Sequence, residues 1–227
     1  MESAPSCYTA DPLGTDPVFA GLSRAIFDTA NPAPYTEGRA RGLSEELIRT
    51  ISAEKEEPEW MLEHRLGSFR ICNALPLPSF GPDLSGLDLE DILYYAPSGT
   101  EATDDWQELP EEIRRVYDRL GIPEAERRML AGAGAQYESE IIYHNLKKQW
   151  AEKGVIFADM DDALREHPDL VRRYFMTCVP PSDHKFAALH GAVWSGGTFL
   201  YVPAGVEVSE PLQAYFRMNA KNMGQFE

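Results

Sequence analysis

The chain has 227 residues, 43% hydrophobic and 26% charged, a globular composition that excludes collagen-like and disordered polypeptides. Its formal net charge of −16 argues against a nucleic-acid partner, because the phosphates would be repelled. We expect a cytoplasmic protein with no membrane partner, since the first residues lack the features of a secretory signal, no apolar run reaches the ~18–20 residues of a membrane span, and the three cysteines lie far apart.

The first third of the chain is predicted to consist of a flexible arm followed by two helices. Residues 1–42 are rich in Pro and Gly and lack periodicity, so they are predicted to be a flexible arm. Ser44 is a candidate N-cap for a helix whose apolar residues recur at helical spacing, and a second such stripe follows Pro58. Residues 75–87 are predicted to be loop. For residues 89–95 a short strand and a helical turn both remain open.

The middle of the chain is predicted to be mainly helical. Pro110 and Pro123 occupy first helical positions, each followed by acidic residues that favour a helix start. Apolar residues spaced by four predict a long helix over residues 138–153. A short strand follows at 155–158, and residues 161–175 are predicted to be helical with a break at their internal proline.

From Phe186 onward, turn residues separate short β-type runs, the first of which are FAALH and AVW. Residues 198–202 are apolar on both alternating faces, which predicts a strand covered on both sides. Residues 212–219 alternate cleanly, with an apolar face and a polar face. The polar face is either a solvated outer surface or the interior of a closed solenoid, and it consists of Gln213, Tyr215, Arg217 and Asn219.

The β-rich region is predicted to need further strands beyond Glu227. Short strands at this spacing favour a sandwich, a barrel or a β-solenoid, and each of these needs further strands to bury both faces. A solenoid end also needs a polar cap, which residues 225–227 do not offer. We therefore expect the chain to be the front piece of a larger protein whose reactive residues lie beyond Glu227.

Four residues have the side chains of metal ligands but not the compact spacing of a zinc site, and they are His167, Cys178, His184 and His190. The pattern favours surface or loop histidines, so no metal site is predicted. Cys72 and Cys178 are expected to pack rather than to bind. Ser195-Gly196-Gly197 lacks the context of a nucleophile elbow and is predicted to be a turn. No catalytic residue is predicted.

Six runs closely resemble the N-terminal half of the SufB family, the scaffold subunit of the Suf iron–sulfur cluster assembly system, and the resemblance extends over about residues 42–227, nearly everything outside the arm. Three of these runs are GIPEAERRMLAGAGAQYESE (121–140), VPPSDHKFAALHGAVWSGGTFLYVP (179–203) and PLQAYFRMNAKNMGQFE (211–227). The others are residues 42–66, 81–85 and 143–175. Runs of this length are far more specific than any short motif in the chain.

The resemblance implies an α+β fold, with a helical N-terminal region (43–180) followed by the first turns of a parallel β-helix (181–227), which is truncated here. It implies a scaffold rather than an enzyme, assembled with a SufD-like paralogue, a SufC-like ATPase and a cysteine desulfurase system. The family handles an iron–sulfur cluster, but the cluster ligands lie beyond Glu227, so no cofactor is expected on this part. Within it, Arg217 and Asn219 are predicted to line the interior route of sulfur or the growing cluster.

Two alternatives remain open at this point. The chain could be a non-catalytic protein-interaction module that keeps only its helical contacts to partners. It could also be a fragment of a β-solenoid enzyme acting on small molecules, although no catalytic constellation supports this.

Overall fold

The computed structural model describes residues 31–97, 99, 103, 105–119, 130, 132–220 and 222–227. The described α-helices are α1 (Glu45–Glu54), α2 (Glu59–Ala74), α3 (Glu111–Arg119), α5 (Lys148–Ala151), α6 (Met160–Glu166), α7 (Pro168–Tyr174) and α8 (Lys185–Val193). Short 3₁₀ turns are η2 (Pro34–Thr36), η3 (Leu89–Asp91) and η4 (Trp106–Glu108). The described strands are β1 (Gly132–Tyr137), β2 (Glu140–Leu146), β3 (Ile156–Asp159), β4 (Thr198–Tyr201) and β5 (Leu212–Arg217).

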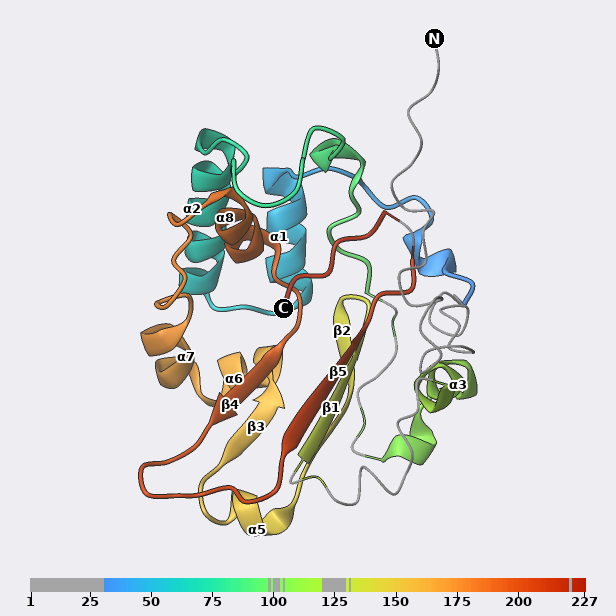
Figure 1. Cartoon of the computed structure of the whole chain (residues 1–227), viewed down its shortest axis with the longest axis vertical. Helices are drawn as coiled ribbons and strands as arrows, with labels where there is room; N and C mark the ends of the chain where they lie inside the picture. Colours follow the sequence, from blue (N-terminus) through green and yellow to red (C-terminus); the bar gives the residue numbers. More distant parts are fainter. Residues whose placement is uncertain are drawn as a thin grey trace, which may run out of the picture.

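The strands form two small sheets, one of three strands in the order β2-β1-β5 and one of two, β3-β4. Figure 1 shows α1, α2 and α8 grouped at one end of the molecule, the two sheets at the other, and α3 beside the larger sheet. One hydrophobic core lies between the three helices, and a second lies between α3 and the β1–β2 hairpin. None of the helices described is long and apolar enough to cross a membrane.

The predicted helix pair is confirmed as α1 and α2. The Ser44 side chain caps α1 by accepting a hydrogen bond from the Leu47 amide at 3.1 Å. Residues 75–87 contain no helix or strand, as predicted. Residues 89–95 combine both alternatives, because η3 is followed by extended chain that forms a parallel bridge between Leu93 and Met223.

Residues 186–194 were expected to be strands, and this prediction is wrong, because they form most of α8. Local signals favour the helix: His184 caps it by accepting a hydrogen bond from the Ala187 amide at 3.1 Å, and the segment is rich in alanine, the best helix former. Gly191 lies inside α8 rather than at a turn between strands, and it allows close packing on α2, since a Cβ there would lie 2.6 Å from the Ser68 hydroxyl oxygen.

The long helix predicted over 138–153 is also wrong, because most of this segment is β2, followed by the short α5. Ile142 and Leu146 suggested a helix through their spacing of four, but residues four apart also share one face of a strand. The sequence did not predict β1, since Gly and Ala have low strand propensity. Pairing overrides propensity here: β1 lies between β2 and β5, and all six of its residues are buried.

β1 and β5 pair in parallel although about 80 residues separate them. Their register runs from Gly132 opposite Leu212 to Tyr137 opposite Arg217. The predicted strand in 212–219 is thereby confirmed as β5. β4 forms where residues 198–202 predicted a strand, but it is not covered on both sides, since Leu200 is 51% exposed.

The remaining predictions have mixed outcomes. The strand at 155–158 is confirmed as β3, and the helical stretch with its break at Pro168 is confirmed as α6 and α7. The helix expected at Pro110 is confirmed as α3, whereas the one expected at Pro123 lies outside the described residues. So does most of the predicted arm, of which residues 31–42 are described and include η2.

A buried carboxyl at the start of α6 makes the stability of the fold depend on pH. Asp159 caps α6 by accepting a hydrogen bond from the Asp162 amide at 2.9 Å. Burial, with the nearby Asp162 and Asp161 adding to it, raises the pKa of Asp159 from 3.8 to about 7. The folded protein therefore keeps a proton between these pH values that the unfolded chain has lost, so stability falls as the pH rises through this window.

Asp159→Asn is expected to flatten this pH dependence, because asparagine can still cap the helix but does not titrate. The measurement is urea unfolding of the parent protein and the variant at several pH values between 4 and 8. Subtracting the two profiles isolates Asp159 from other acids, such as Glu227, whose pKa burial also raises. Parallel profiles for the two proteins would contradict the assignment.

Candidate functional site

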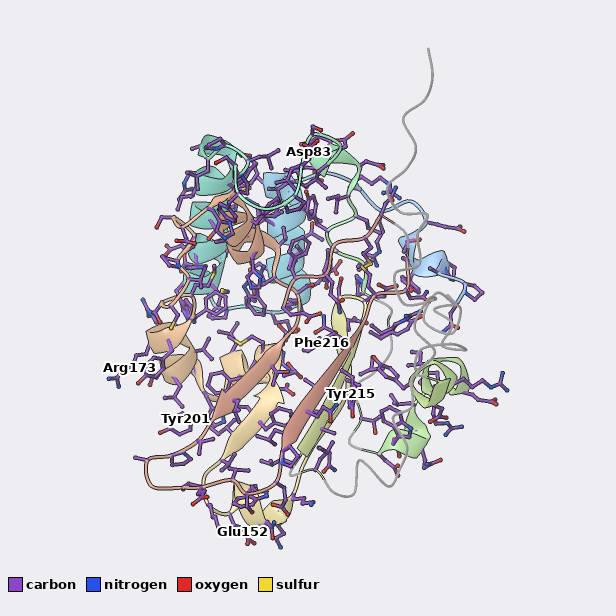
Figure 2. All side chains as sticks on the ribbon, in the orientation of Figure 1. Asp83, Glu152, Arg173, Tyr201, Tyr215 and Phe216 are labelled. Atoms are coloured by element: carbon purple, nitrogen blue, oxygen red, sulfur yellow. The ribbon has the colours of Figure 1, made fainter. Side chains whose placement is uncertain are left out.

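β5 and the two residues that follow it turn their polar face inward. Asn219 is only 7% exposed, and the Tyr215 ring packs against the core between α3 and β1. The Arg217 Nε atom is buried. On the other face Phe216 and Met218 are exposed, at 40% and 44%, whereas Leu212 at the start of the strand is partly buried. Figure 2 shows Tyr215 on the α3 side of β5 and Phe216 on the opposite side.

From Phe216 onward this arrangement inverts the usual strand of a soluble protein, which buries its apolar face and exposes its polar one. Of the two alternatives for the polar face, the structure has the inward orientation for Arg217 and Asn219. That these two residues line a channel stays a prediction.

The inner face continues into a polar cluster around Glu138, in the turn between β1 and β2. Glu138 is fully buried, and its Oε1 atom accepts a hydrogen bond from the Tyr35 hydroxyl at 2.7 Å. The same oxygen accepts hydrogen bonds from the amides of Asn219 at 3.2 Å and Ala220 at 2.8 Å. The Glu138 amide in turn donates to the Arg217 carbonyl at 3.0 Å. One carboxylate thus joins η2, the hairpin and the end of β5.

The Asn219 side chain is held at both of its polar atoms. Its Oδ1 atom accepts from the Asn31 amide at 2.7 Å, and its Nδ2 atom donates to the Asn31 carbonyl at 3.0 Å. The Asn31 side-chain amide donates to the Tyr137 hydroxyl at 3.3 Å. The orientation of the Asn219 amide is therefore fixed by the chain immediately before η2.

Tyrosine hydroxyls around this cluster are kept protonated. Burial raises the pKa of Tyr35, and its hydrogen bond to Glu138 raises it further. Burial likewise raises the pKa values of Tyr117 and Tyr137, while the positive charge of Arg217 lowers both by a smaller amount. The inner face and its cluster thus combine a guanidinium, an amide and neutral hydroxyls with the Glu138 carboxyl group, and Arg217 is the group among them that would attract an anionic guest.

A buried glutamine links this cluster to the segment before β4. The Gln136 side chain donates to the Glu138 carbonyl at 2.9 Å and accepts from the Gly197 amide at 3.0 Å. Gly196 cannot carry a side chain here, since a Cβ would lie 2.3 Å from the Gln136 Oε1 atom. The residues predicted to be a turn, 195–197, instead form a buried connection between α8 and β4.

Three of the four candidate metal-ligand residues line the same cavity, without grouping as ligands of one ion. Cys178, His184 and His190 line a cavity of about 380 Å³ beside α7 and α8, and His167 is not among its lining residues. Cys178 was expected to pack, which is wrong, because it is exposed on the segment joining these helices; Cys72 is buried as expected. Within the described ranges, no three His, Cys, Asp or Glu side chains are grouped as a metal ion would require.

Sequence reasoning missed Glu138 and Tyr35. Residue 138 was assigned to the start of a helix, and residue 35 to a flexible arm. The only local signal for the turn was the short polar pair Glu138-Ser139 before an apolar run, and a buried role for an acidic residue is not visible in such a signal.

Comparisons with known proteins agree on one family. A family model described as the SufBD protein N-terminal region matches residues 135–214, from within β1 to within β5. An iron–sulfur cluster assembly SufBD family protein of Staphylococcus saprophyticus is 55% identical over 187 residues, which is 82% of this chain and 40% of that protein. Proteins of the same description from Staphylococcus haemolyticus and Staphylococcus aureus are 55% and 54% identical over the same shares of each chain.

The chain therefore belongs to the SufBD family, which confirms the predicted resemblance at that level. It spans about 40% of the length of these relatives.

Proposed function

We propose that the chain is the N-terminal part of a SufB-type scaffold on which iron–sulfur clusters are assembled. The relatives are each named as iron–sulfur cluster assembly proteins, which supports the process, and the long runs similar to SufB support this branch of the family. In this proposal the protein is not an enzyme. The cluster is its cargo, and the cluster ligands belong to the rest of the protein.

The observation that carries the proposal is the inward polar face of β5. A strand that served only to stabilise a soluble domain would bury Phe216 and expose Arg217. The reverse arrangement has a reason if the interior handles a polar guest. Sulfide, persulfide and clusters bound by thiolates are anionic, so they would be attracted to the Arg217 guanidinium.

We further propose that β1 and β5 belong to adjacent rungs at the start of a parallel β-helix. Parallel pairing is what joins the strands of neighbouring rungs in such a solenoid. The exposed apolar side chains of Leu200, Phe216 and Met218 would then be covered by neighbouring parts of the intact protein, since an apolar strand face is otherwise prone to aggregation.

A scaffold of this type works with other proteins, and we propose a SufD-like paralogue, a SufC-like ATPase and a cysteine desulfurase system as partners. ATP hydrolysis would belong to the SufC-like subunit, and the desulfurase would supply the sulfur. The strongly acidic surface would favour basic surfaces on these partners.

Complementation tests the proposal. The gene for the intact protein, with those for its SufC-like and SufD-like partners, is introduced into a bacterium whose own scaffold genes are under repressible control. We expect growth and iron–sulfur enzyme activity to be restored under repression. The corresponding genes of Staphylococcus saprophyticus are the positive control. Failure of this gene set where the control succeeds would contradict the proposed function and favour a protein-interaction module.

A further inference from the structure

Glu138 occupies a position that is locally unfavourable for a glutamate. It is the first residue of the two-residue turn between β1 and β2, and its φ of 56° lies in the left-handed region, where glycine and asparagine are preferred. It is also completely buried, which is rare for an acidic side chain. A residue kept in a strained and buried position invites a search for what it contributes there.

Three of its hydrogen bonds go to the end of β5 and the chain that follows it. The Oε1 atom binds the amides of Asn219 and Ala220, two consecutive donors just past the last residue of the strand. The backbone amide of Glu138 binds the Arg217 carbonyl. The strand pairing of β1 with β5 ends at Tyr137 and Arg217. The hydrogen bonds of Glu138 therefore connect the two chain segments directly beyond the end of the sheet.

The third group on Oε1 is the Tyr35 hydroxyl, which also lies 3.4 Å from the Asn219 side-chain nitrogen. Glu138 therefore fixes Asn219 twice, directly through its amide and indirectly through Tyr35. Hydrogen bonds to a buried charged group are stronger than those between neutral groups, so these contacts hold the segment firmly.

We propose that Glu138 is the positioning residue of the inner face: through Oε1 it holds residues 217–220 so that Arg217 and Asn219 present their side chains inward. This inference rests on the proposed function for the reaction it serves. The Oε1 contacts themselves belong to the fold and can be tested without any cluster.

The second carboxylate oxygen of Glu138 allows a positioning role to be distinguished from direct binding of the cargo. Glu138 Oε2 is buried and has no hydrogen-bond partner among the described residues. If Glu138 acted as a direct ligand to the cargo, Oε2 would be the acting atom. Glu138→Gln keeps an oxygen for the Oε1 contacts and replaces the second oxygen with an amide nitrogen, so it preserves positioning and removes ligation.

Hydrogen exchange of the intact protein is the first readout. Glu138→Gly removes the carboxylate while keeping the left-handed turn unstrained. We expect exchange at the amides of Asn219 and Ala220 to become faster by about tenfold or more in this variant, and to stay within about threefold of the parent in Glu138→Gln. Unchanged exchange in Glu138→Gly would overturn the proposal.

Glu56→Gly is the matched control, because Glu56 is an exposed glutamate whose φ of 53° is also left-handed. It changes the same residue type in the same backbone conformation, but away from β5. Exchange at residues 217–220 should be unaffected by it.

Cluster yield on the intact protein is the second readout. We expect Glu138→Gly to lower it to the level of Arg217→Ala, the double variant to fall no further, and Glu138→Gln to stay near the parent value. A loss in Glu138→Gln as large as in Glu138→Gly, or additive losses in the double variant, would overturn positioning. A parent protein that assembles no cluster would refute the proposed function, whereas hydrogen exchange would still decide the role of Glu138.

Discussion

Arg65→Leu is expected to lower the free energy of unfolding of the intact protein by about 3–5 kcal/mol, because it leaves a buried carboxylate without its partner. The side chains of Arg65 and Glu57 are both fully buried, with 2.5 Å between the Arg65 Nη2 and Glu57 Oε1 atoms. A second hydrogen bond joins the Arg65 Nε and Glu57 Oε2 atoms at 2.7 Å. The pair is thus bidentate and shielded from water, unlike the surface ion pairs of the chain.

Arg65 also connects α2 to α8. Its Nη1 atom donates to the Ala192 carbonyl at 3.1 Å, and its guanidinium carbon lies 4.5 Å from the centre of the Trp194 ring. The substitution therefore removes an ion pair, a cap on the end of α8 and a cation–π contact at once. This combination places its expected effect above that of any surface substitution.

Urea unfolding of the parent and the variant measures this effect. The matched control is Arg49→Leu, since Arg49 forms an exposed pair with Glu45 one helical turn away, and such pairs contribute about 0.3–0.5 kcal/mol. The double variant Glu57→Leu with Arg65→Leu should recover part of the loss, because no unpaired charge is then buried. A loss for Arg65→Leu no greater than that of the control would contradict the burial of this pair.

Arg217→Ala is expected to lower the cluster yield of the intact protein by about tenfold, the effect of losing one charge-assisted hydrogen bond of about 1.5 kcal/mol. The fold should remain intact, because β5 pairs with β1 through its backbone and the Arg217 carbonyl keeps its hydrogen bond to the Glu138 amide. The measurement compares the iron and sulfide content of parent and variant after anaerobic assembly, with far-ultraviolet circular dichroism as the check on folding.

Arg173→Ala is the matched control for this variant. Arg173 is an exposed residue of α7 whose guanidinium lies over the Tyr174 ring, so the same chemical change is made far from the inner face. We expect its cluster yield to equal that of the parent. Equal cluster yields for Arg217→Ala and the control would contradict a role for Arg217 in handling sulfur or the growing cluster.

The sequence predicted elements whose signals are local. The Ser44 cap, the apolar stripes of α1 and α2, and the Pro168 break each depend on residues within one or two helical turns, and each is confirmed. β1 could not be predicted in this way, because its small residues gain their strand conformation from β2 and from β5, which is about 80 residues away.

Only part of the candidate site could be predicted, because some of its features depend on local sequence and others on contacts between distant segments. Alternation in residues 212–219 identified a strand with a polar face, and the resemblance to SufB singled out Arg217 and Asn219. The alternation leaves the orientation of this face open and the resemblance predicts that it lies in the interior, but neither gives its support by Glu138 and Tyr35. Those contacts join segments about 80 to 180 residues apart, so only the three-dimensional structure contains them.

Anaerobic cluster assembly on the purified intact protein tests the central claim most directly. The protein is incubated with its SufC-like and SufD-like partners, ferrous iron, cysteine and a cysteine desulfurase, and its visible absorption and Mössbauer spectra are recorded. We expect an iron–sulfur cluster that the protein then passes to an apo-ferredoxin. Spectra without a cluster, under conditions in which the Staphylococcus saprophyticus relative assembles one, would contradict it.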